Sequence, residues 1–234
     1  MESTMKCTIY HRHGGFRHTP NNEKLQIEDD GSFSMWRSVG VASIPPSLIG
    51  RFEGKLETEL NTRLWDLAEA VTATGDLRVV PPPDSVIEDI VLPGAHATLG
   101  IHQQAGVPWD SITGLLRPLL GELTKFPRAA IELEIRDDGR QALLVHRGNE
   151  QLRADLSKIS IEAILWRNDA VESRWQGSLE EIRDQGIIQT VPGWSLDIPF
   201  HHGFDITSDN RIVAYASFNA FDGEMFVPVS LQSG

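Results

Sequence analysis

Two short segments with the same pattern strongly restrict how this chain can fold. Leu25–Gly31 and Leu133–Gly139 each read Leu-x-Ile-x-Asp-Asp-Gly. The alternating apolar residues predict a strand with one buried face. Asp-Gly predicts a tight turn, because glycine tolerates the positive φ that such turns require. Each segment therefore predicts a β-hairpin, and the two hairpins can have arisen independently or by duplication of a domain.

Apolar periodicity assigns most of the remaining chain to strands and helices. Leucines spaced three and four apart predict an amphipathic helix over 57–71. A second helix is predicted from an N-cap at Asp110 to about residue 123, with a kink or a break into two turns at Pro118. A short helix is predicted after Ser178, and 51–56 fits a strand or a helix start. Strands are predicted at 6–12, 24–28, 33–37, 86–92, 97–102, 130–135, 142–146, 152–156, 211–220 and 225–231. The predicted fold class is α+β, mostly antiparallel sheet with two or three packed helices.

A run of prolines is the clearest candidate for a domain boundary. Pro81, Pro82 and Pro83 are consecutive, which forbids helix and central strand and favours a stiff, extended connector. A chain of 234 residues suits one large domain or two small ones. We therefore expect an N-terminal α+β domain over 1–80 and a C-terminal α+β domain over 81–234 that is β-rich toward its end.

The charge balance argues against two classes of partner. The chain has 33 acidic and 21 basic residues, a formal net charge of −12, and no run of Lys or Arg. Such a surface repels phosphate backbones. The apolar segments are far shorter than the roughly 20 residues that span a bilayer. We expect neither nucleic acid nor membrane as a partner, whereas a basic protein partner is compatible with this charge.

Cysteine usage and the absence of known motifs bear on location and chemistry. Cys7 is the only cysteine, which excludes an internal disulfide and fits a reducing compartment. The N-terminal residues do not resemble a secretory signal, so a cytoplasmic location is expected. Gly-x-Gly-x-x-Gly, His-Glu-x-x-His and Cys-x-x-Cys do not occur. These observations favour a non-enzymatic protein without a cofactor.

Two groups of histidines are candidate metal ligands. His11 and His13 point to the same side of a predicted strand, and His18 follows in a loop. An exposed strand edge explains the same pattern, because no neighbouring Cys or carboxylate pair completes a ligand set. His201, His202 and Asp205 could supply metal ligands or a general base with its carboxylate. Adjacent histidines on a strand face opposite sides, so joint ligation there requires a bulge. His96 and His102 are isolated, and a hydrogen-bonded, partly buried position is expected for each.

Aromatic residues beside turns are candidate binding residues. Phe16 follows Gly14 and Gly15, so it could form a protruding anchor. Trp109 follows a proline and Trp194 follows Pro-Gly, which predicts that both lie in loops. A tryptophan in a loop can anchor a protein interface, or it can seal the edge of the core.

The N-terminal third resembles the small bacterial proteins of the emfourin type. The matching segments are Ile9–Phe16 with its Gly-Gly-Phe break, Leu25–Ile27, and Gly54–Leu56 leading into the leucine-rich 60–67. This resemblance implies non-catalytic inhibition of thermolysin-like metalloproteases by a surface segment that enters the cleft.

Three functional hypotheses follow from the sequence. The first is a protein-binding module, either a protease inhibitor or an immunity- or antitoxin-type protein that neutralises a basic partner. The second is a metal-assisted hydrolase that uses His201, His202 and Asp205. The third is a structural subunit of a larger assembly.

Overall fold

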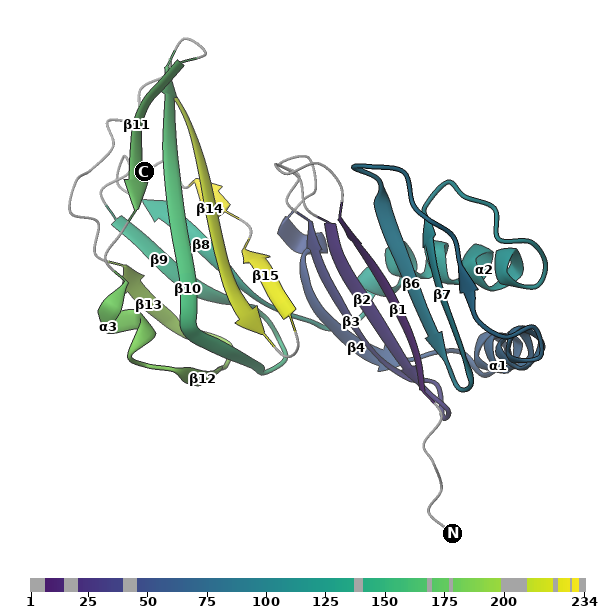
Figure 1. Ribbon diagram of the computed structural model, residues 1–234. Coiled ribbons are helices and arrows are strands. Elements are labelled where there is room, and N and C mark those ends of the chain that lie inside the picture. The colour runs from purple at the N-terminus through teal and green to yellow at the C-terminus, as the bar shows by residue number, and fades with distance from the viewer. Residues whose placement is uncertain are drawn as a thin grey trace. The chain divides into compact units, whose positions relative to one another are not determined.

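The chain is an α+β protein with mostly antiparallel sheets, as predicted. The computed structural model describes residues 7–14, 21–39, 46–136, 141–167, 170–176, 179–198, 210–220, 223–227 and 229–231. Two compact units comprise 1–44 with 51–127, and 45–50 with 128–234. The first unit is purple to teal in Figure 1, and most of the second is green to yellow.

The first unit is built on an antiparallel sheet with β1 near its centre. β1 pairs with β2 along its whole length and with β6 from Ile9 to Gly14. Among the described strands of the first unit, only the two-residue β5 runs parallel to its neighbour. The strands lie in the order β4 (Gly50–Lys55), β3 (Ser32–Val39), β2 (Asn21–Glu28), β1 (Cys7–Gly14), β6 (Val86–Leu92), β7 (Ala95–Gly100) and β5 (Leu77–Arg78).

The proline run lies inside this unit rather than between two units. Pro81–Pro83 separates β5 from β6, and both strands belong to the same sheet. The run ends in a turn at Pro83 and Asp84, closed by a 3.3 Å hydrogen bond from the Ser85 N–H to the Pro82 carbonyl, rather than continuing as the extended connector that its composition predicts. Pairing of β1 with β6 joins the segments on its two sides. The boundary expected near residue 80 therefore does not coincide with the division in the structure, which falls at Pro127/Arg128.

Several local predictions match the observed elements. α1 (Thr58–Thr72) and α2 (Trp109–Glu122) occupy the two predicted helical segments, and 51–56 falls on the strand β4. The turn between β2 and β3 contains Gly31 at φ +83°. α2 continues through Pro118 into the 3-10 helix η2 (Leu123–Lys125). The N-cap of α2 is Pro108 rather than Asp110, which lies in the first turn of the helix. The Asp110 carboxylate accepts hydrogen bonds from the backbone N–H groups of Ala105 and Gly106 at 2.8 and 3.0 Å.

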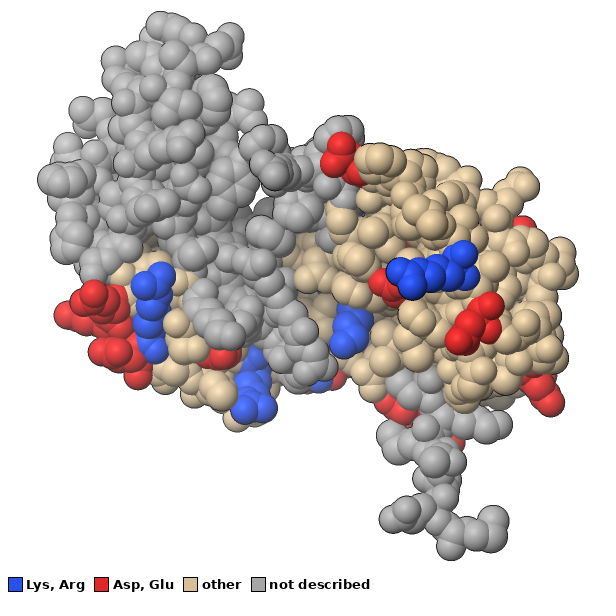
Figure 2. Space-filling model, in the orientation of Figure 1, with Lys and Arg blue, Asp and Glu red and all other residues tan. Residues whose placement is uncertain are grey.

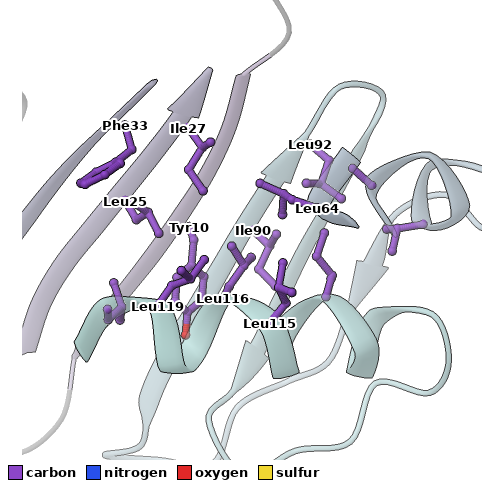
Figure 3. Packing of buried hydrophobic residues seen from close by; sticks show 14 of the residues in the cluster. Tyr10, Leu25, Ile27, Phe33, Leu64, Ile90, Leu92, Leu115, Leu116 and Leu119 are labelled. Carbon is purple, nitrogen blue, oxygen red and sulfur yellow. The ribbon is translucent and has the colours of Figure 1, made fainter. Parts of the chain in front are cut away.

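The core of the first unit lies between one face of the sheet and the two helices. Alternate residues of β1, β2, β3 and β6 turn toward α1 and α2 and are almost fully buried. Burial of each large apolar side chain contributes about 1.5–3 kcal/mol. Figure 3 shows the packing of Tyr10, Leu25, Ile27, Phe33 and Ile90 with helical residues that include Leu64, Leu115, Leu116 and Leu119.

A row of buried charges crosses the same helix-facing side of the sheet. Cross-strand pairing aligns Arg37, Glu23, Arg12 and Glu88. Glu88 is fully buried and receives hydrogen bonds from Arg117 Nε of α2, 2.9 and 3.1 Å from its two oxygens, and from the Tyr10 hydroxyl. Glu23 is also fully buried and is paired with Arg12 and Arg37. We call this set the ion-pair row.

In the part of the chain that the structure describes, the second unit contains two groups of paired strands and one short α-helix. The Leu133–Gly139 segment lies on a predicted hairpin, and β8 and β9 are indeed antiparallel with Leu133 opposite Leu144. One group contains β8 (Arg128–Arg136), β9 (Gln141–Gly148), β13 (Ser195–Ile198) and β16 (Val229–Leu231). The other contains β10 (Leu152–Arg167), β11 (Ala170–Gln176), β12 (Ile187–Thr190), β14 (Asn210–Ala220) and β15 (Gly223–Val227). The helix is α3 (Glu180–Arg183), and η1 (Pro46–Leu48) precedes β4. Among the helices of the described ranges, none is long and apolar enough to cross a membrane.

We predict that the ion-pair row depends strongly on Glu88. Glu88→Ala leaves the Arg117 guanidinium and the Tyr10 hydroxyl without their acceptor, and removing one partner of a buried ion pair costs about 3–5 kcal/mol. Urea denaturation should show a loss of this size in the free energy of unfolding. Glu122→Ala, on the exposed side of α2, is the control and should change it by less than about 0.5 kcal/mol. Equal effects of the two variants would contradict the role given to Glu88.

We also predict an alkaline loss of stability that originates at Tyr10. Burial, and then the hydrogen bond to Glu88, raise the pKa of Tyr10 above its ordinary value of 10.0. Above about pH 10 the unfolded chain therefore releases this proton while the folded chain keeps it, so stability falls as pH rises. Tyr10→Phe should make this decline shallower by up to about 1.4 kcal/mol per pH unit. Denaturation at several pH values between 8 and 11 measures the slope, and an unchanged slope would contradict the prediction.

Candidate functional site

The face of the first sheet that points away from α1 and α2 carries polar and apolar side chains in regular rows. Strand alternation places the odd-numbered residues of β1 and β6 and the even-numbered residues of β2, β3 and β7 on this side. Apart from Ser38, which is buried, the described side chains of this set are half-buried or exposed, in contrast to the helix-facing set. We call this surface the open face, and it comprises Ile9, His11, His13, Asn22, Lys24, Gln26, Glu28, Ser34, Trp36, Ile87, Asp89, Val91, His96 and Thr98.

Asp89 lies at the centre of a polar cluster on the open face. Its Oδ2 lies 2.7 Å from His13 Nε2, and its Oδ1 accepts a hydrogen bond from Thr98 Oγ1 at 2.5 Å. His96 Nε2 lies 3.7 Å from the same Oδ1. Three strands contribute these groups, because Asp89 of β6 is flanked by β1 and β7.

His11 completes the cluster on β1. Its ring stacks on that of His13, with centroids 4.5 Å apart and an interplanar angle of 28°. Its Nε2 lies 2.9 Å from Asn22 Oδ1 on β2. Spacing of two along a strand places both imidazoles on one side, as the sequence predicts. His11 is the direct cross-strand partner of Asp89, and His13 is its diagonal neighbour.

These three residues have the arrangement and chemistry of metal ligands. One ligand atom from each of His11, His13 and Asp89 can be chosen so that all lie within 4.8 Å of one another. We call them the His–His–Asp cluster. The sequence identified the two histidines but not the carboxylate, because Asp89 is 76 positions from His13 and no local motif connects them. His96 is also not isolated, since it lies beside Asp89.

The surroundings favour the protonation states that bind metal. Burial lowers the pKa of His11, which favours its neutral form. For Asp89, burial acts to raise the pKa, but the hydrogen bonds from Thr98 and His13 outweigh it, so the pKa lies below its ordinary value. Metal ligands must be neutral imidazoles and ionised carboxylates.

The structure describes three of the other candidate residues, Gly14, Trp109 and Trp194. Gly14 ends β1 at φ +88°, and an added Cβ would lie 3.2 Å from the Ser85 carbonyl oxygen. Trp109 is not in a loop, because it is the first residue of α2 and is buried in the core at 3% exposure. Trp194 is half-buried in the turn before β13. Outside the described residues lie Gly15, Phe16, His18, His201, His202 and Asp205.

A surface pocket of about 400 Å³ lies beside α2 in the same unit. Its lining includes His102, Gln103, Asp110 and Arg117. Arg117 is paired with Glu88, and Asp110 with the backbone at 105 and 106. Gln103 Oε1 accepts a hydrogen bond from the Gly100 N–H, and Gln103 Nε2 donates one to the Val80 carbonyl. Because these groups are engaged within the chain, the pocket is a weaker candidate site than the open face.

Comparison with known proteins adds no functional assignment. No family model and no curated protein sequence matches the chain. A crystal structure of MHC-like MILL2 is similar at 9% sequence identity, covering 96% of this chain and 100% of that one, with a TM-score of 0.20. Similarity at this level carries no argument about fold or function.

Proposed function

We propose that the chain is a non-enzymatic protein-binding module and that the open face is its binding surface. The observation that carries this proposal is that, among the described residues of the first unit, both long helices pack on the same face of the sheet. α1 and α2 cover only the face that contains Tyr10 and Leu25, and the other face carries the apolar side chains of Ile9, Trp36, Ile87 and Val91 among polar ones. Val91 is 41% exposed. Apolar and aromatic groups of this kind form the centres of protein interfaces.

The charge distribution supports the same surface. The same alternation places Glu28, at the end of β2, on the open face, so Lys24 offsets one of two acidic side chains there, Asp89 and Glu28. Next to this face, on β4, Arg51 is paired with Glu53, whereas the whole chain carries a net charge of −12. In the view of Figure 2 the surface of the first unit is mostly uncharged, with isolated acidic and basic side chains. Interface cores are depleted of charged residues, because each charge removed from water costs free energy.

The class of protein that we propose as the partner is argued from the amino-acid sequence alone. The resemblance of the N-terminal third to emfourin-type proteins makes a thermolysin-like metalloprotease the first candidate partner. The proposed contact residues are Gly14, the last residue of β1, and Gly15 and Phe16, which follow it in the sequence. The charge of −12 equally suits a basic partner of an immunity- or antitoxin-type protein, since complementary charge raises the association rate. Trp194 stays a predicted contact residue.

Two alternatives remain as hypotheses with distinct tests. The first alternative is a metal-assisted hydrolase, in which His201, His202 and Asp205 bind one metal ion per chain. Substitution of His201 should then abolish turnover. A structural subunit requires a stable oligomer or a co-purifying assembly in gel filtration. The cytoplasmic location also remains a prediction, which cell fractionation tests.

We predict that a charge at Val91 disrupts partner binding. The partner is first identified from an untagged pull-down by mass spectrometry, and the complex is reconstituted from purified components. Val91→Glu places a carboxylate in the proposed interface and should weaken the affinity at least tenfold, which is about 1.4 kcal/mol. Val107→Glu is the matched control, because Val107 is 87% exposed before α2 and lies off the open face. Equal affinity of the two variants would exclude the open face as the interface.

A separate variant tests the segment that follows β1. If Phe16 inserts into the partner, Phe16→Ala should weaken the complex by more than about 1 kcal/mol. Calorimetric titration of the same purified complex measures the change. An unaltered affinity would show that this segment lies outside the interface. Val91→Glu would then be the only one of the two variants that weakens the complex.

A further inference from the structure

We infer that His11, His13 and Asp89 bind one divalent transition-metal ion of the zinc type on the open face. The inference rests on the geometry of the first sheet and does not depend on the proposed protein partner. The inferred site differs from both metal sites that the sequence suggests. One of those consists of His11, His13 and His18 without a carboxylate, and the other consists of His201, His202 and Asp205.

Strand geometry supplies the first part of the argument. β1 presents His11 and His13 side by side, and pairing with β6 places Asp89 against both. All three sit on hydrogen-bonded strands inside one sheet, so their Cα positions are held by backbone pairing on both sides of β1. Zinc bonds of about 2.0–2.2 Å in a tetrahedron separate ligand atoms by about 3.3 Å. Chosen ligand atoms of the cluster already lie within 4.8 Å of one another, and side-chain rotation can close the remaining difference.

Ligand chemistry selects the class of ion. Two imidazoles and one carboxylate suit Zn²⁺ and its neighbours in the first transition row. Ca²⁺ and Mg²⁺ prefer sites built only from oxygen atoms. Three protein ligands leave a fourth position, which water or the nearby His96 can fill.

Neighbouring side chains hold the ligands in the way that outer-shell groups do in known metal sites. Asn22 Oδ1 contacts the His11 imidazole at 2.9 Å, and Thr98 Oγ1 donates to Asp89. Such contacts fix ring and carboxylate orientation, and their loss typically weakens metal binding by about 10- to 100-fold. A plain surface ion pair between His13 and Asp89 would need neither the stacked second imidazole nor these supports.

The test is a zinc-binding titration of the untagged full chain, with metal content measured by mass spectrometry after equilibrium dialysis. We expect one tight Zn²⁺ per chain and no displacement by excess Ca²⁺. His13→Asn and Asp89→Asn should each weaken this binding at least tenfold. Matched controls are His102→Asn and Asp66→Asn, which change exposed residues of the same unit away from the cluster and should leave the affinity within about twofold. Zinc binding that is absent from the wild-type chain, or equal in all five proteins, would overturn the inference.

A second measurement on the unaltered chain keeps the inference testable if a variant fails to fold. Imidazole nitrogen signals in a ¹⁵N NMR spectrum report metal ligation directly. Addition of Zn²⁺ should shift the signals of His11 and His13 together at one equivalent. Shifts confined to His18, His201 or His202 would place the metal elsewhere and overturn the inference.

Discussion

The antiparallel pairing of β1 with β6 is the constraint on which the rest of the first unit depends. It joins segments that lie on opposite sides of α1 and the proline run, and it makes one sheet of them. Tyr10 and Glu88, which are 78 positions apart, meet because of this pairing. His13 and Asp89 meet for the same reason on the other side of the sheet. The core, the ion-pair row and the candidate metal site thus share a single structural cause.

Strand alternation then separates these features by face. Glu88 points toward the helices, where Arg117 and Tyr10 satisfy it, while its neighbour Asp89 points to the open face among histidines. A shift of the β6 register by one residue would exchange the two carboxylates. It would also move Ile90 and Leu92 from the core to the open face, so the core packing of β6 enforces the register that assembles the His–His–Asp cluster. Stability on one face and ligand placement on the other are therefore coupled.

Local patterns predicted the elements of the fold but not their long-range pairing. The leucine spacing over 57–71 and the Asp-Asp-Gly turn at Gly31 depend on nearby residues, and both match the structure. Trp109 was misplaced because a preceding proline suggests a loop, whereas packing against the sheet buries this residue at the start of α2. The joint orientation of His11 and His13 followed from strand periodicity. Asp89 could not be found in this way, because its role depends on which strand pairs with β1.

A crystal structure grown with zinc, with data collected at the zinc absorption edge, is the most direct test of this account. One anomalous peak should lie about 2.0–2.2 Å from an imidazole nitrogen of His11, one of His13 and a carboxylate oxygen of Asp89. The same map should show Glu88 on the helix-facing side beside Arg117. A peak only at other residues, or Asp89 facing the helices, would contradict the β1–β6 register and the metal site that it assembles.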